Sequence, residues 1–152
     1  MRDTLRTHSW QYFDLHANQR MSVFNFYLIF VGLLTGGLAK VFEKDFPLPE
    51  LGMVFGFLLF LVSVVFWRMD NRTSSLIKYA ENALRQWESS IPDHDLSGFE
   101  GARIFSLEEI ETERKKAKSW GLLTYGQCLR AVFLVFSIVG VAALVGSYYR
   151  AL

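Results

Sequence analysis

The sequence has little cysteine and little histidine, and each scarcity excludes a class of protein. The single cysteine, Cys128, cannot form an intrachain disulfide or a CxxC pair for metal or redox chemistry. The three histidines stand far apart, and no HExxH, GxSxG or P-loop motif occurs. A net charge of +1 spread along the chain gives no case for nucleic-acid binding. We therefore expect no enzyme activity, no metal and no cofactor.

Three long blocks of the sequence lack Asp, Glu, Lys, Arg and His altogether. They are residues 21–39, 51–67 and 131–149, in a chain that is 51% hydrophobic and 16% aromatic. A helix of about 17 to 25 apolar residues crosses the roughly 30 Å hydrocarbon core of a bilayer. Core helices of soluble proteins are rarely apolar around their whole circumference. The sequence therefore predicts an all-α integral membrane protein with three transmembrane helices.

The remaining segments divide the chain around these blocks. Residues 1–20 have apolar side chains at spacings of three or four, which predicts an amphipathic start to the first helix, with Ser9 as its cap. Residues 21–67 form a transmembrane hairpin, residues 131–149 the third crossing and residues 150–152 a short tail.

Residues 68–130 form a helical insert between the second and third crossings. The second crossing is expected to continue into the insert as an amphipathic helix that ends at Pro92. A polar loop with Gly98 and Gly101 follows. Ser106 and Glu109 have the spacing of a capping box, which predicts the start of a second insert helix.

The distribution of Lys and Arg predicts the orientation in the membrane, because cytoplasmic flanks carry the excess of these residues. Only Lys40, Lys44 and Arg150 fall on the side opposite to the N-terminal segment and the insert. The N-terminus and the insert are therefore expected in the cytoplasm, and the C-terminus outside.

Small residues recur at a spacing of four in all three blocks. They are Gly32 and Gly36, Gly52 and Gly56, and Ala142 and Gly146. Small residues let helices approach closely in lipid, where hydrophobicity gives no drive to associate. The pattern predicts helix packing, either within one subunit or between subunits.

Polar side chains gather at the cytoplasmic end of the first crossing, namely His16, Gln19, Arg20 and Asn25. Polar groups at this depth are costly unless they face another helix or water. Either a hydrogen bond between helices or the mouth of a pore would satisfy them. Arg130, at the start of the third crossing, could reach the interface or face the same mouth.

Several strings of the sequence carry a resemblance to a known family: Trp10–Met21 (WQYFDLHANQRM), Phe24–Tyr27 (FNFY), Arg68–Arg72 (RMDNR), Leu76–Ile77, Ala80–Glu81 and Tyr125–Cys128 (YGQC). Together they resemble the RipA-like octameric membrane proteins of bacteria. That group is similar to the pore-forming accessory proteins of CRISPR systems and to SLATT-type antiphage effectors.

The resemblance implies a homo-oligomer of the bacterial inner membrane, such as an octamer, that permeabilises the membrane during infection. Its partners would be membrane lipid, further copies of itself and a cytoplasmic defence protein. The insert has no arginine-histidine nuclease motif, which argues against a direct role with RNA. The alternative hypothesis is a non-conducting scaffold, whose insert recruits a cytoplasmic partner through an apolar stripe of Leu76, Ala80, Ala83 and Trp87.

Overall fold

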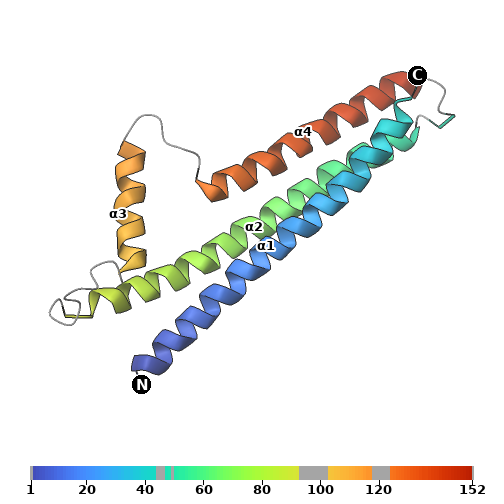
Figure 1. Ribbon diagram of the computed structural model, residues 1–152. Helices are drawn as coiled ribbons and strands as arrows, with labels where there is room; N and C mark the ends of the chain where they lie inside the picture. The colour runs from blue at the N-terminus through green and yellow to red at the C-terminus, as the bar shows by residue number, and fades with distance from the viewer. Residues whose placement is uncertain (1, 44–46, 49, 93–102, 118–123, 152) are drawn as a thin grey trace. The chain divides into compact units, whose positions relative to one another are not determined.

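The computed structural model describes residues 2–43, 47–48, 50–92, 103–117 and 124–151, and its regular structure there is entirely helical. The helices are α1 (Arg2–Val41), α2 (Glu50–Ser89), α3 (Ile104–Ala117) and α4 (Tyr125–Ala151), in the order drawn in Figure 1. The all-helical fold predicted from the sequence is confirmed.

Three of these helices are long and apolar enough to cross a membrane. The qualifying segments are Arg6–Val41 in α1, Glu50–Ser89 in α2 and Tyr125–Arg150 in α4. Many of their large apolar side chains are exposed, among them Leu33, Phe57 and Ile138. Contiguous exposed apolar surface is rare on soluble monomers and is what a lipid environment accepts. The prediction of three transmembrane helices is therefore confirmed.

The second crossing and the first part of the insert are one helix. The helix α2 continues past Trp67, where the apolar block stops, and ends at Ser89, shortly before Pro92. This agrees with the sequence, because a proline cannot continue a helix and disfavours helical geometry in the residue before it.

Two predicted helix starts are wrong, and tertiary contacts explain both. The helix α1 begins at Arg2, so Ser9 lies inside it; the Arg6 guanidinium lies 4.8 Å from the centre of the Trp87 ring, which gives the added turns a partner. The helix α3 begins at Ile104, so Ser106 is not its cap. The Glu88 carboxylate of α2 instead accepts hydrogen bonds from the backbone N–H groups of Phe105 (3.2 Å) and Ser106 (3.0 Å).

The chain forms two compact units. The insert unit contains residues 1–19 and 73–124, and the span unit contains residues 20–72 and 125–152.

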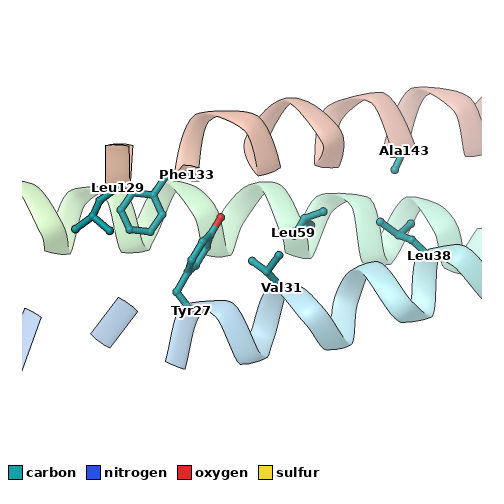
Figure 2. Packing of buried hydrophobic residues seen from close by; sticks show 7 residues of the cluster. All are labelled: Tyr27, Val31, Leu38, Leu59, Leu129, Phe133 and Ala143. Carbon is teal, nitrogen blue, oxygen red and sulfur yellow. The ribbon is translucent and has the colours of Figure 1, made fainter. Parts of the chain in front are cut away.

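The core of the span unit is built by α1, α2 and α4 together. Figure 2 shows its buried side chains, which are Tyr27, Val31 and Leu38 of α1, Leu59 of α2, and Leu129, Phe133 and Ala143 of α4. The rings of Tyr27 and Phe133 meet edge to face, with their centres 4.6 Å apart. On α1 and on α4 these residues recur at spacings that are sums of three and four, so each of the two helices turns one face to the core.

The end of the span unit near the α1–α2 connection is fastened by Arg150 of α4. Its guanidinium donates to the backbone oxygens of Val41 (3.0 Å) and Glu43 (2.7 Å), at the C-terminal end of α1. A cation is favourable there because a helix leaves unpaired carbonyl groups and partial negative charge at its C-terminus.

Candidate functional site

Three charged side chains, one from each spanning helix, meet in the span unit. Arg20 of α1 binds Asp70 of α2 with two hydrogen bonds, from Nε to Oδ1 (2.6 Å) and from Nη2 to Oδ2 (3.1 Å). Arg130 of α4 places its Nε 4.0 Å from Asp70 Oδ2. The Asp70 side chain is 4% exposed, Arg20 is 12% and Arg130 is 43%. The buried carboxylate therefore hydrogen-bonds Arg20 and has Arg130 at ion-pair distance, and the network carries a surplus positive charge.

The positions of these residues in the sequence explain why they meet. Arg20 directly precedes the first apolar block, Asp70 follows the second and Arg130 directly precedes the third. The helices α1 and α2 are antiparallel neighbours, and α4 lies beside them and runs in the same direction as α1 (Figure 1). These three block ends therefore lie together. The bidentate Arg20–Asp70 pair fixes the register of α1 against α2, since a planar guanidinium accepts a carboxylate in few orientations.

Tyr125 and Gly126 of α4 complete the surroundings of Arg20. The Arg20 guanidinium lies 5.8 Å from the centre of the Tyr125 ring, and the Tyr125 hydroxyl donates to the sulfur of Met21 (2.7 Å). A Cβ atom at Gly126 would lie 3.3 Å from Arg20 Nη2. Glycine at this position therefore lets α4 pass close to the guanidinium.

A second polar contact lies deeper between the helices. The buried Tyr27 hydroxyl and Ser63 Oγ are 3.0 Å apart, and Ser63 Oγ donates to the backbone oxygen of Leu59 (2.8 Å). Since the Ser63 proton is used on Leu59, Tyr27 is the donor to Ser63. Both hydroxyls are thus satisfied, as burial away from water requires.

The five polar residues predicted from the sequence do not gather in one place. The structure joins Arg20 to Arg130 through Asp70. His16 Nδ1 and Gln19 Oε1 are 3.3 Å apart in the insert unit, where the His16 ring also packs edge-on against Tyr12. Asn25 is exposed on α1, and its side chain has no hydrogen bond to any described residue. The residue that sequence reasoning missed is Asp70, which closes the network.

The small residues predicted for helix packing have different surroundings. A Cβ atom at Gly56 would lie 2.7 Å from the backbone nitrogen of Leu144, and one at Gly140 would lie 2.7 Å from that of Phe60. A Cβ atom at Gly52 would clash with the side chain of Ser147. Gly56 and Gly140 therefore let the backbones of α2 and α4 approach closely. A Cβ atom at Gly32 or Gly36 would instead meet nothing within 4 Å.

The predicted partner stripe lies on α2 in the insert unit, where it is partly covered. Ala80 is buried, Leu76 and Trp87 are half-buried, and Ala83 is exposed. Trp87 lines a pocket of about 360 Å³ that is also formed by Arg6, Trp10, Leu84, Glu88, Ile104 and Phe105. Partner binding by this stripe stays a prediction.

Within the described ranges, no group of three His, Cys, Asp or Glu side chains is placed to hold a metal ion. The charged network of Arg20, Asp70 and Arg130 links the three spanning helices.

Comparison with known proteins places this chain in a family. Residues 4–146 match the family described as the octameric membrane protein family. The chain is also 34% identical over 134 residues to CD-NTase-associated protein 19 of Escherichia coli, a stretch that covers 88% of this chain and 84% of that protein. No solved structure matches the chain. The chain therefore belongs to the octameric membrane protein family, and the resemblance found in its sequence is confirmed.

Proposed function

We propose that this member of the octameric membrane protein family assembles into a homo-oligomeric pore of the bacterial inner membrane and acts as an effector in antiphage defence. The family description supports an assembly of eight copies. The likeness to CD-NTase-associated protein 19 supports a role beside a defence nucleotidyltransferase. The pore itself is argued from the exposed face of α1.

The observation that carries the pore is the position of Asn25. Phe24, Tyr27 and Val31 face the core, whereas Asn25 lies on the opposite, exposed face of α1, four residues inside the apolar block. A polar side chain facing lipid at this depth is costly, and one facing a water-filled cavity is not. A ring of copies that turned Asn25 toward a common axis would place this amide against water.

The charged network suits the mouth of such a pore. By the distribution of Lys and Arg, the end of the span unit that carries Arg20, Asp70 and Arg130 would face the cytoplasm, and the C-terminus would face outward. The network would hold the three helices of each copy together there. Arg130, the most exposed of the three, would add positive charge to the mouth.

Ion flux through vesicles tests the proposal. Purified assembly in vesicles should release a trapped salt or dye, and Asn25→Leu should reduce the flux without changing the mass of the assembly. Ile29→Leu is the matched control, because Ile29 lies one turn further on the same exposed face and is already apolar. An assembly of full mass that conducts no ions in vesicles or in infected cells would refute the proposed pore.

A non-conducting scaffold is the second candidate, and the pocket beside Trp87 favours it. In this case the insert unit would recruit a cytoplasmic defence protein, and neither candidate needs a catalytic step. The variant Trp87→Ala separates the two functions. Loss of a captured partner with unchanged flux would favour the scaffold, whereas loss of flux with no partner captured by either form would favour the pore.

A further inference from the structure

We infer that neighbouring copies contact each other through their insert units: the outer face of α3 in one copy packs on the outer face of α2 in the next copy. The inference rests on the proposed homo-oligomer and names a pair of surfaces outside the spans. It leaves the exposed face of α1 that carries Asn25 free to line the proposed pore.

The helix α3 turns its large aliphatic residues away from its own chain. Ile104, Leu107 and Ile110 recur at a spacing of three and form one stripe, and their side chains are 64%, 47% and 64% exposed. Phe105 is the residue that packs inward, with its ring edge to face against Phe13 and the ring centres 5.6 Å apart. An apolar stripe on a helix normally faces a protein core. Within the described part of the insert unit, this stripe faces outward instead.

The helix α2 has a second outward face in the same unit. Its buried residues there are Ile77, Ala80, Leu84 and Glu88. They recur at spacings of three and four, so they mark the face that α2 turns to its own unit. Tyr79 lies about 200° around the helix from Ile77 and is 70% exposed. Ala83, one turn further, is also exposed and leaves room beside the tyrosine ring.

The charges beside the two faces are opposite in sign. Glu108 and Glu111 flank the apolar stripe of α3, and both are exposed. On α2, Lys78 is exposed beside Tyr79, and the Arg85 guanidinium donates to the side-chain oxygen of the exposed Asn82 (3.4 Å). Complementary charge across an interface favours the right partner and fixes its register. The acidic α3 face therefore suits the basic α2 face of another copy.

A ring also requires two different faces. A closed ring of more than two copies around one axis uses head-to-tail contacts, in which one patch binds a different patch of the neighbour. Two α3 faces could attract each other, with Glu108 against Arg114, but a contact of one face with itself joins only two copies. The Glu88 carboxylate on the buried side of α2 caps α3, whereas Tyr79 lies on the far side of α2, so both faces can be occupied at once. The octameric family supplies a neighbour for each.

A membrane surface is a less suitable occupant for the α3 stripe. Amphipathic helices that lie on membranes carry Lys and Arg beside their apolar face, because the lipid headgroups of the cytoplasmic leaflet are anionic. The residues beside this stripe are instead Glu108 and Glu111. Anionic headgroups would repel them, so a second copy is the occupant that the charges favour.

Cysteine cross-linking between full-length chains tests the contact. Two chains with different tags are co-expressed in a Cys128→Ser background, one with Ile110→Cys and the other with Tyr79→Cys. Oxidation in native membranes is followed by denaturing electrophoresis. Leu107→Cys with Ala83→Cys is a second pair, since a disulfide needs Cβ atoms about 4 Å apart and one pair could miss that geometry. The matched control pairs Ile110→Cys with Leu15→Cys, because Leu15 is 63% exposed on α1 of the same unit.

The expected result is a covalent dimer that contains both tags, from either α3–α2 pair and not from the control pair. Dimers of the Ile110→Cys chain with itself would show α3 against α3 and overturn the inference. An assembly of full mass in which neither pair cross-links would also overturn it, leave the homo-oligomer standing and assign the stripe to lipid or to another protein. A monomer in nanodiscs would remove both the inference and the proposed function.

Discussion

The buried Arg20–Asp70 pair allows a quantitative prediction for the variant Asp70→Asn. Removing one partner of a buried ion pair typically costs about 3–5 kcal/mol, because the other charge stays buried without compensation. Asparagine keeps the size of the side chain and one acceptor oxygen, and unfolded helices in a membrane also find polar partners. We therefore expect a loss near the lower limit, about 3 kcal/mol, which is roughly a hundredfold in the folded-to-unfolded ratio.

Unfolding of the purified chain in mixed detergent measures this loss. A double-mutant cycle with Arg20→Gln isolates the pair, and we expect the double variant to lose clearly less than the sum of the two single losses. Lys40→Gln is the matched control, because it breaks the exposed Lys40–Glu43 pair (2.8 Å) and should leave unfolding nearly unchanged. Additive losses in the cycle, or an Asp70→Asn variant as stable as the parent, would refute the reasoning.

Four further substitutions test separate parts of the structure. Gly56→Leu should prevent α2 and α4 from packing and sharply lower stability in detergent, whereas Gly32→Leu should leave the unfolding of a single chain unchanged, because a side chain at position 32 meets nothing in its own chain. Tyr27→Phe should cost about 1 kcal/mol of stability, since Ser63 loses one of its two hydrogen bonds; no change would mean that the hydroxyl is not buried. Glu88→Gln should weaken the first turn of α3 by about 1 kcal/mol, seen as faster hydrogen exchange of its first amides. Exchange at the parent rate would argue against the cap.

The three spans could be predicted from the sequence, because a long block without charged residues identifies a span whatever it packs against. The same holds for the end of α2, where Pro92 acts through local geometry. The starts of α1 and α3 could not be predicted from the sequence, since they depend on contacts with Trp87 and Glu88 from another part of the chain. Local capping patterns carry no information about such contacts.

The candidate site was predictable only in part. Arg20 and Asn25 are five residues apart, which turns their side chains about 140° from each other on a helix, so one surface could not hold both. The role of Asp70 could not be predicted, because its partners lie on other helices. The glycine pairs look alike in the sequence, and their different surroundings arise from which face each helix turns inward.

The unbroken helix α2 limits how this protein can change length during evolution. Within the span unit its buried residues keep one phase from Leu59 through Ser63 to Asp70. Inserting a single residue after Ser63 would rotate everything downstream by about 100°, so Asp70 would leave its buried position. Gains or losses of seven or eleven residues come close to whole turns and would preserve the phase. Relatives should therefore accumulate their insertions and deletions between helices, and α2 should keep its spacing even where its residues differ.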